Sequence, residues 1–426
     1  MSSTRKRAIW WLAGLVPFFF ISYDFSNWAA GRRLSVPSIV FDWESHIPFL
    51  AWTILPYWTT DFFYVLSVFL CKNNKEVDAH GKRLLAAQAI SVCCFLLFPL
   101  HFSYAQPKTT GLFGWLFHAL GNFDKPFNQA PSLHLSLTTI LWAKYSEHMS
   151  GFSLFLMRCW FVLMGLSTLT TYQHHFIDLP AGIWVGLFCI VLFPTEKVPS
   201  PRSVRSRTIA AVYFAGSMLL AVVGFSTGRL GWLLFWPAGA LLIIAAVYWT
   251  GSPELFRDNE GVMEPARILL LAPYVAAKWL HTRWWGEPGA HEIVNGVWLG
   301  RLPRRAERDA LRIASVVHLA AELPADGTGI LSRGVPMLDL IAPTADQLEA
   351  GVKAIDGMNT ARPTLVCCAL GYSRSAAVMA AWLVANRRAA SIDAAIAMIQ
   401  AHRPRVVLTT AHRERLHEWA RARTGN

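Results

Sequence analysis

The chain of 426 residues is long enough to form two or three domains. Its hydrophobic content of 54% and charged content of 15%, together with 19 tryptophans, exclude an ordinary soluble protein and indicate an integral membrane protein. The net charge of +12 does not imply a nucleic-acid partner, because the basic residues gather beside apolar segments and in an Arg-rich C-terminal region.

The seven cysteines lack the spacing of a metal site. Four of them form the adjacent pairs Cys93-Cys94 and Cys367-Cys368, which are a poor framework for disulfides. We therefore expect reduced cysteines, and neither a metal nor another cofactor.

Eight apolar segments are candidate membrane spans, although several are shorter than the ~20 residues that a full crossing needs. They cover residues 8–23, 49–70, 84–102, 133–145, 152–171, 179–193, 209–225 and 230–249. The first six are expected to form one membrane domain, residues 1–194. The first segment follows Arg5-Lys6-Arg7 as in a signal peptide, but no small-residue cleavage site comes after it, so we interpret it as a span.

Loop charges predict the orientation of these spans. With eight spans, one side of the membrane carries Arg5, Lys6, Arg7, Lys72, Lys75, Lys82, Arg83, Lys144, Arg158, Lys197, Arg202, Arg205 and Arg207. The positive-inside rule makes that side the cytoplasm, with Arg32 and Arg33 as the main exceptions. We expect an integral protein of a bacterial inner membrane with both termini in the cytoplasm.

Two histidine motifs enclose the fourth and fifth spans. The first is Pro131-Ser132-Leu133-His134 and the second is His174-His175-Phe176-Ile177-Asp178. Two consecutive spans return the chain to the side that it left, so the motifs can meet at the outer membrane face. The spacing predicts that Asp178 lies beside His174 on one helical face and accepts the proton of one imidazole nitrogen. His174 can then attack phosphorus, and His134 can protonate the departing oxygen.

These motifs resemble the type 2 phosphatidic acid phosphatase superfamily, whose second and third motifs read Pro-Ser-Gly-His and Ser-Arg-x5-His-x3-Asp. The resemblance implies that His174 is the nucleophile, that Asp178 orients it and that His134 is the acid. Leu133 replaces the glycine of the second motif, and Thr168 replaces the arginine of the third. The motifs are more similar to the inositol phosphorylceramide synthase branch, which transfers a phosphoryl head group to an alcohol.

The first motif of that family, Lys-x6-Arg-Pro, has no clean match. Lys108 and Lys125 are the nearest candidates for a phosphate-binding cation, and Ser132 is a further candidate phosphate ligand. Three interpretations of the membrane half stay open: a lipid phosphate phosphatase, a head-group phosphotransferase, and a non-catalytic anchor or sensor.

Residues 195–289 are expected to contribute two more spans and a linker. Residues 266–280 within this segment are apolar but short for a span. They carry Pro273 and are flanked by Arg267, Lys278 and the pair Trp284-Trp285. We interpret them as an interfacial helix rather than a ninth span, which keeps the following domain in the cytoplasm.

Residues 290–426 have the composition of a soluble domain. Strands are expected at residues 297–299, 316–319 and 365–367, and helices at residues 346–358 and 375–385. Strands that alternate with helices predict an α/β domain of ordinary size.

The segment Cys368-Ala369-Leu370-Gly371-Tyr372-Ser373-Arg374-Ser375 lies between an expected strand and an expected helix. Cys-x5-Arg in this setting predicts an anion cradle, in which the amides of residues 369–373 bind phosphate and Arg374 clamps two of its oxygens. The same positive field favours a thiolate nucleophile at Cys368, and Ser375 can donate a hydrogen bond to the sulfur when it leaves.

This segment resembles the dual-specificity branch of the protein tyrosine phosphatases. The resemblance runs from Val297 to Trp419 and includes Trp298-Leu299-Gly300-Arg301-Leu302-Pro303, Val317-His318-Leu319-Ala320-Ala321-Glu322 and His402-Arg403-Pro404. It implies a general acid upstream of the loop, for which Asp339 fits best and Asp346 second; either can instead be a helix cap. Cys367 stands where the family usually has a histidine that tunes the nucleophile.

The predicted fold class is a multi-span α-helical membrane domain followed by a soluble α/β cysteine-phosphatase domain. The predicted function is a bifunctional membrane phosphatase, with a histidine-based lipid phosphate site outside and a cysteine-based phosphomonoester site in the cytoplasm. The five residues between Cys368 and Arg374 include no cation, which favours a monophosphorylated substrate. A phosphatidylinositol or phosphatidylglycerol monophosphate is expected first, and the phosphotyrosine of a phosphoprotein second.

Overall fold

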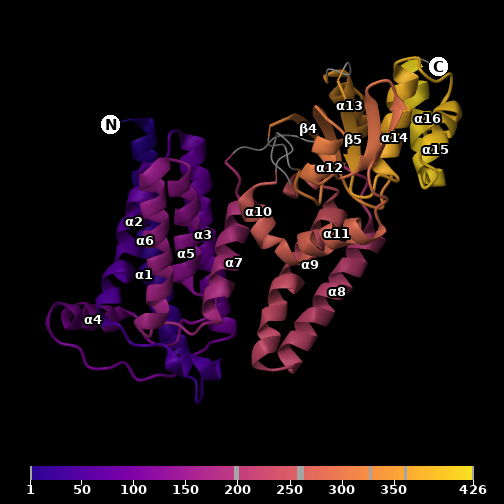
Figure 1. Cartoon of the computed structure of the whole chain (residues 1–426). Coiled ribbons are helices and arrows are strands. Elements are labelled where there is room, and N and C mark those ends of the chain that lie inside the picture. The colour runs from indigo at the N-terminus through magenta and orange to yellow at the C-terminus, as the bar shows by residue number, and fades with distance from the viewer. Residues whose placement is uncertain (1, 196–200, 257–262, 326–328, 359–361, 425–426) are drawn as a thin grey trace. The chain divides into compact units, whose positions relative to one another are not determined.

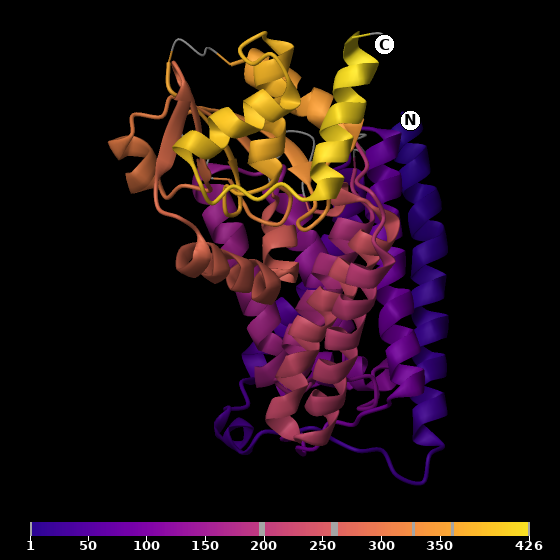
Figure 2. The ribbon, with the colours of Figure 1, turned by 90° about the vertical axis from the view of Figure 1, so that its right-hand side faces the viewer.

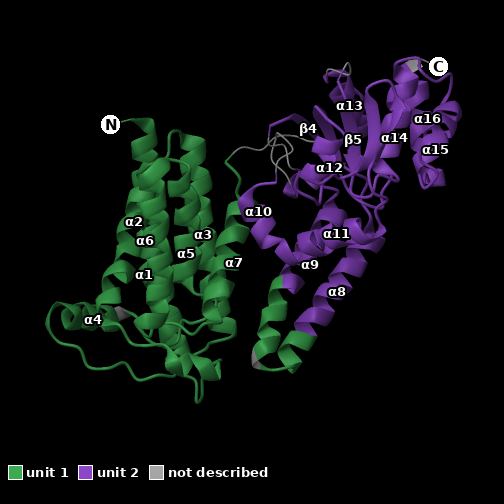
Figure 3. Cartoon of the chain, viewed as in Figure 1, with its two compact units in different colours: residues 1–196, 223–236 green, residues 197–222, 237–426 purple. Residues whose placement is uncertain are grey.

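The computed structural model describes residues 2–195, 201–256, 263–325, 329–358 and 362–424 (Figure 1). The chain divides into two compact units, shown in different colours in Figure 3. The first unit comprises residues 1–196 and 223–236, and the second comprises residues 197–222 and 237–426.

The first unit is a bundle of helices that run side by side, with one shorter helix across an end (Figures 1 and 2). The bundle helices are α1 (Ser3–Gly31), α2 (Ile54–Phe69), α3 (Asn74–Leu97), α5 (Leu133–Ser146), α6 (Gly151–Thr170) and α7 (Asp178–Leu192). The 3-10 helices η1 (Asp42–His46) and η2 (Ala51–Thr53) lie between α1 and α2. The crossing helix, α4 (Gly111–Phe123), is not among the expected elements, because its three glycines weaken the helical pattern.

Within the described residues, four helical segments are long and apolar enough to cross a membrane, so the prediction of eight spans is confirmed only in part. These segments are Ser3–Gly31, Gly151–Thr170, Arg207–Ser226 and Leu230–Thr250. Helices α2, α5 and α7 have 16, 14 and 15 residues, which is short for a crossing. Helix α3 has 24 residues, but its first half is rich in charged side chains.

Two basic residues that the sequence assigns to cytoplasmic loops are buried inside the bundle. Helix α3 begins at Asn74, earlier than predicted, and therefore includes Arg83. The Nε of Arg83 donates a hydrogen bond to the carbonyl oxygen of Phe193 at 2.9 Å. Lys144 on α5 is ion-paired with Glu76 on α3. Each buried cation is thus compensated by a partner, and the two contacts join α3 to α5 and to the end of α7.

Helices α5 and α7 pack at close range, which brings both histidine motifs to one end of the bundle. A Cβ at Gly182 would lie 2.4 Å from the carbonyl oxygen of Ser132, and one at Gly186 would lie 2.7 Å from that of Ser136. The hydroxyl of Ser136 is also within hydrogen-bond distance of the carbonyl oxygens of Ser132 and Gly182, at 2.9 and 3.0 Å. These glycines permit a backbone approach that larger residues would prevent.

The second unit contains parts of two long helices, a linker and an α/β domain. The helical elements between the first bundle and the sheet are α8 (Arg207–Ser226), η3 (Arg229–Leu234), α9 (Phe235–Thr250), η4 (Pro253–Leu255), α10 (Pro265–Leu270) and α11 (Ala272–Trp285), of which η3 and the adjoining ends of α8 and α9 belong to the first unit. The linker therefore forms two helices where the sequence predicts one. The break falls at Leu271, immediately before the first turn of α11, where Pro273 favours a helix start.

The α/β domain is built on a five-stranded sheet of order β1-β2-β5-β3-β4. The strands are β1 (Ala290–Val294), β2 (Val297–Arg301), β3 (Ser315–Ala320), β4 (Leu331–Met337) and β5 (Thr364–Cys368). Strands β1 and β2 are antiparallel, and the other neighbours are parallel. The sequence does not predict the edge strand β4, because Gly334 and Pro336 are unusual inside strands.

Helices cover this sheet and bury its apolar core. They are α12 (Arg305–Ala310), α13 (Ala345–Asp356), α14 (Arg374–Ala385), α15 (Ile392–His402) and α16 (Thr410–Thr424). Leu299, Val317 and Val366 from three adjacent strands are fully buried. Because β2, β5, β3 and β4 are parallel, their carboxyl ends share one edge, which is where α/β proteins commonly bind ligands.

Candidate active sites

The cysteine loop begins where β5 ends, at that carboxyl edge. Gly371 has a φ of +75°, and a Cβ there would lie 2.4 Å from the carbonyl carbon of Gly300, so the loop requires glycine at this position. The amide of Gly371 and the hydroxyl of Ser375 each donate a hydrogen bond to Cys368 Sγ at 3.3 Å. The structure thus places the hydroxyl of Ser375 beside the sulfur of Cys368, the candidate nucleophile.

Donors outside the loop hold its carbonyl groups. The carbonyl oxygens of Ala369, Leu370, Gly371 and Tyr372 each accept a hydrogen bond from elsewhere in the domain. Fully buried Arg403 supplies two of these bonds, to Gly371 at 3.2 Å and to Leu370 at 3.4 Å. Because the carbonyls have these partners, we expect the loop amides to remain free to bind phosphate oxygens.

Arg374 is buried at the start of α14, and its terminal nitrogens are bound to acids. They donate to both carboxylate oxygens of Glu322 at 2.7 Å, and one lies 3.0 Å from Asp339 Oδ1. Burial opposes the charged guanidinium, but Glu322 and Asp339 outweigh it and raise the pKa of Arg374 above its ordinary value. The expected clamp on two phosphate oxygens is therefore incomplete here. Among the described residues the buried Nε has no partner, so it is the atom that a phosphate oxygen can satisfy.

Asp339 follows β4 and is held between two cations. Its Oδ1 is 3.0 Å from Arg374, and its Oδ2 is 2.8 Å from Lys278 Nζ. Burial by itself raises the pKa of Asp339, but Arg374 and Lys278 outweigh it and hold that pKa well below its usual range. Asp339 is therefore a carboxylate in this arrangement, and it must gain a proton before it can act as a general acid.

Asp346, the second candidate acid, is exposed in the first turn of α13. The alternative expectation that Asp346 caps this helix is wrong, because Thr344 occupies the cap position. The hydroxyl of Thr344 accepts a hydrogen bond from the amide of Gln347 at 3.3 Å. Asp346 instead adds negative charge at the N-terminus, where the helix dipole favours it.

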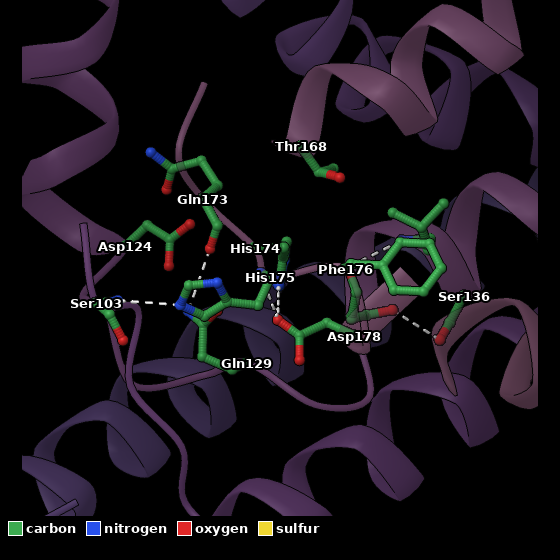
Figure 4. Close-up of polar contacts among 12 residues, drawn as sticks. Ser103, Asp124, Gln129, Ser136, Thr168, Gln173, His174, His175, Phe176 and Asp178 are labelled. Carbon is green, nitrogen blue, oxygen red and sulfur yellow. Dashed lines mark hydrogen bonds and ion pairs between the residues drawn. The ribbon is translucent and has the colours of Figure 1, made fainter. Parts of the chain in front are cut away.

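The pair His174 and Asp178 lies at the N-terminal end of α7 (Figure 4). His174 Nδ1 is 3.3 Å from Asp178 Oδ2, which also accepts the backbone N–H of His175 at 2.9 Å. The sequence predicts this pairing but not its conformation, because α7 begins only at Asp178 and His174 lies in the preceding loop. A proton on Nδ1 leaves Nε2 as the basic nitrogen of His174.

The contacts of His175 exclude it as the nucleophile. The amide of Ser103 donates to His175 Nε2 at 3.1 Å, so the ring proton is on Nδ1, which lies 2.9 Å from Glu44 Oε2. Burial raises the pKa of Glu44, but the bonds from His175 and two backbone amides outweigh it and lower that pKa. Both nitrogens of His175 are thus engaged, and its neighbour His174 is the reactive candidate.

His134 lies in the first turn of α5, at the same end of the bundle. Its Nε2 is 2.8 Å from the hydroxyl of Thr60, and its ring stacks on Tyr57 with centroids 4.2 Å apart. The backbone amide of Ser132 donates a hydrogen bond to the carbonyl oxygen of Asp178 at 3.1 Å, which joins the two histidine motifs directly. The structure therefore gathers the three residues that the histidine motifs single out.

Asp124 is a member of this site that the sequence does not reveal. Its carboxylate accepts hydrogen bonds from the hydroxyls of Tyr23 and Tyr57, at 2.8 and 3.4 Å. Figure 4 draws Asp124 in the same group of residues as His174. Tyr57 contacts both Asp124 and His134, so it connects the Asp124 carboxylate to the first histidine motif.

Of the candidate phosphate ligands, Ser132 is bonded to the histidine motifs, and the two lysines have other surroundings. The hydroxyl of Ser132 caps α5, and its amide donates to the carbonyl oxygen of Asp178 at 3.1 Å. Lys125 Nζ donates to the carbonyl oxygen of Gly121 at 2.9 Å, and Lys108 is exposed. Among the described residues, neither lysine forms a hydrogen bond or ion pair with a histidine. The N-termini of α5 and α7 are the positive groups that remain.

The loop at the sheet edge, with its thiol, hydroxyl donor and buried guanidinium, defines a cysteine-dependent phosphatase domain. Residues 297–422 match the family described as dual specificity phosphatase, catalytic domain. The C-terminal domain of this chain is therefore a dual-specificity phosphatase domain, and it implies phosphoric monoester hydrolase activity.

Solved structures of similar domains cover about a third of the chain. A crystal structure of Tk-PTP in its active form is 29% identical, covers 31% of this chain and 97% of its own, and has a TM-score of 0.29. PTPMT1 in complex with PI(5)P is 22% identical, with coverages of 32% and 97% and a TM-score of 0.29. Human DUSP28 is 22% identical, with coverages of 32% and 97% and a TM-score of 0.30. No curated protein matches the chain significantly.

Proposed function

We propose that the chain is a membrane-bound phosphatase whose cysteine site hydrolyses phosphomonoesters in the cytoplasm. The observation that carries this proposal is the pair of hydrogen bonds to Cys368 Sγ from Gly371 and Ser375. The thiolate attacks phosphorus, and the sulfur–phosphorus bond forms as the bond from phosphorus to the ester oxygen breaks. Asp339, after it has taken up a proton from solvent, supplies that proton to the departing oxygen. Water then attacks the phosphocysteine and releases inorganic phosphate, while Ser375 stabilises the departing thiolate.

The charges around the loop favour a substrate with one phosphate. The cations that contact this site already have acidic partners, because Arg374 is paired with Glu322 and Asp339, and Lys278 is paired with Asp339. Arg403 is committed to the loop carbonyls. Each additional phosphate would therefore lose hydration without gaining an unpaired cation. A monophosphorylated lipid head group fits best, because the chain carries helices that can cross a membrane.

This substrate class is tested by assaying the full chain in lipid nanodiscs against mono-, bis- and trisphosphorylated inositol lipids. We expect the highest kcat/KM for the monophosphate and a lower value with each added phosphate. A fragment of residues 290–426 is unsuitable, because it lacks Lys278, which contacts Asp339. A clear preference for the trisphosphate would contradict the charge argument, and a preference for phosphotyrosyl peptides would replace the lipid by a phosphoprotein.

A second candidate function, phosphoryl transfer at the histidine site, rests on a separate observation. His174 Nδ1 faces Asp178 at 3.3 Å, in the arrangement that leaves Nε2 nucleophilic. We propose that His174 takes a phosphoryl group from a lipid phosphate and that His134 protonates the leaving oxygen. Water as acceptor would make the site a phosphatase, and an alcohol would make it a head-group transferase. Labelled phospholipid, supplied with and without inositol or ceramide, distinguishes the two acceptors.

The proposed orientation can be tested with reporter fusions. A reporter fused after Trp249 is expected in the cytoplasm, because eight spans bring the chain back to the side of Arg5, Lys6 and Arg7. The matched control is a fusion after Ser226, between α8 and α9, which is expected outside. A periplasmic signal from the Trp249 fusion would overturn this orientation and the cytoplasmic place of the phosphatase domain.

A further inference from the structure

The loop that carries Asp339 is fixed to segments upstream of the phosphatase domain. Leu338 is buried in an apolar cluster with Tyr248 of α9 and with Tyr274 and Val275 of α11. The hydroxyl of Tyr248 donates a hydrogen bond to the carbonyl oxygen of Asp339 at 3.1 Å. Both the backbone and the preceding side chain of Asp339 are thus held by helices that the phosphatase family does not include, because its match begins at residue 297.

The linker helix α11 also reaches the carboxylate of Asp339. Lys278 Nζ lies 2.8 Å from Oδ2, and its side chain is 17% exposed. The other oxygen, Oδ1, faces Arg374 at 3.0 Å, so each carboxylate oxygen has one cation. Lys278 therefore contacts the general acid of the proposed reaction from outside the domain that performs it.

The charged groups that face the ion pair of Lys278 and Asp339 come from several elements. Arg374 of α14 and Glu322 after β3 form the neighbouring ion pair. Burial opposes the charged form of Lys278, but Asp339 and Glu322 outweigh it and raise its pKa, with a smaller effect from Tyr213. Both cations favour the carboxylate of Asp339, whereas a general acid must be protonated. The groups that face the pair are Arg374, Glu322, Tyr213, Tyr248 and Tyr274.

We propose that Lys278 is a positioning residue of the phosphatase site, through which the linker helix fixes the acid loop and sets the protonation of Asp339. This inference rests on the proposed role of Asp339 as the acid. It makes the linker helix part of the active site. The physical reason is the distance of 2.8 Å in a largely buried place, where an ion pair is little screened by solvent.

The proposal predicts a change in the pH dependence of the full-length protein. Removing the cation with Lys278→Met raises the pKa of Asp339, so the acid stays protonated to higher pH. The alkaline limb of the kcat/KM profile should then move upward by about 1–3 pH units. Lys278→Arg keeps the charge and should leave the limb near its wild-type position. Hydrolysis of phenyl phosphate should depend on the general acid more than hydrolysis of para-nitrophenyl phosphate does, because phenolate is the more basic leaving group. Phenyl phosphate is therefore the substrate that should reveal the shift.

Two controls separate this inference from the assignment of the acid. Lys353→Met removes an exposed lysine on α13 and should leave the profile unchanged. Asp339→Asn should abolish the alkaline limb, and Lys278→Met should cause no further shift in that background. If Asp339→Asn removes the alkaline limb but Lys278→Met does not move it, the proposed role of Lys278 is contradicted while Asp339 remains the acid. A higher KM with an unmoved limb would likewise overturn the proposal, because Lys278 would then bind substrate. An intact limb in Asp339→Asn would reject Asp339 as the acid, and this inference with it.

Discussion

Cys368→Ser is expected to remove the phosphomonoesterase activity of the full chain, by roughly 10⁴-fold or more. A serine hydroxyl at the end of β5 is not ionised at neutral pH, so the donors from Gly371 and Ser375 have no anion to stabilise. The rest of the cradle is unchanged, so substrate should still bind. Hydrolysis of para-nitrophenyl phosphate and the affinity for a nonhydrolysable phosphonate are the two measurements.

The matched control is Cys159→Ser, which changes an exposed cysteine on α6 and should retain full activity. The histidine chemistry should also survive Cys368→Ser, because its residues belong to the other compact unit of the chain. Normal turnover by Cys368→Ser would contradict the nucleophile assignment. Loss of both activities together would contradict the view that the chain carries two independent sites.

His174→Ala is the second variant with a large expected effect. Phosphoryl transfer from labelled phospholipid should fall by about 10²–10⁴-fold, because the nucleophile is lost. The fold should persist, because the backbone of His174 still donates to Thr168 and Asp178 still accepts the amide of His175. Cys368-dependent hydrolysis in the same preparation reports whether the protein remains intact.

Asp178→Asn tests the orienting carboxylate rather than the nucleophile. The amide keeps the shape of the side chain but removes the charge that stabilises a protonated imidazole, so a loss of about 10²–10⁴-fold is expected. His118→Ala, at an exposed site on α4, is the control and should be silent. Full transfer activity in either site variant would leave the membrane half as an anchor for the phosphatase domain.

The local features of both sites could be predicted from the sequence. Cys368 and Ser375 meet because a strand, a tight loop and a helix follow one another, and the glycine at 371 permits the turn. His174 and Asp178 are close in sequence, so their pairing could be expected, although the helix begins later than the spacing implies. The prediction of eight spans is confirmed only in part, because composition does not reveal where helices end or which charges are buried.

Only the tertiary structure decided the contacts between residues that are distant in the chain. Glu322 neutralises Arg374, Glu44 fixes the tautomer of His175, and Lys278 holds Asp339. Local patterns do not specify these pairs, since each depends on how strands and helices are placed in three dimensions.

The sequence by itself therefore determined which atoms can perform the chemistry, because a nucleophile and its nearest donors lie within one loop or one turn. The tertiary structure decided their charge state, because the field at a buried group is the sum over every element packed around it. Asp339 shows the difference: its position after a strand made it a candidate acid, and the cations from α11 and α14 hold its pKa well below the usual range although burial opposes this.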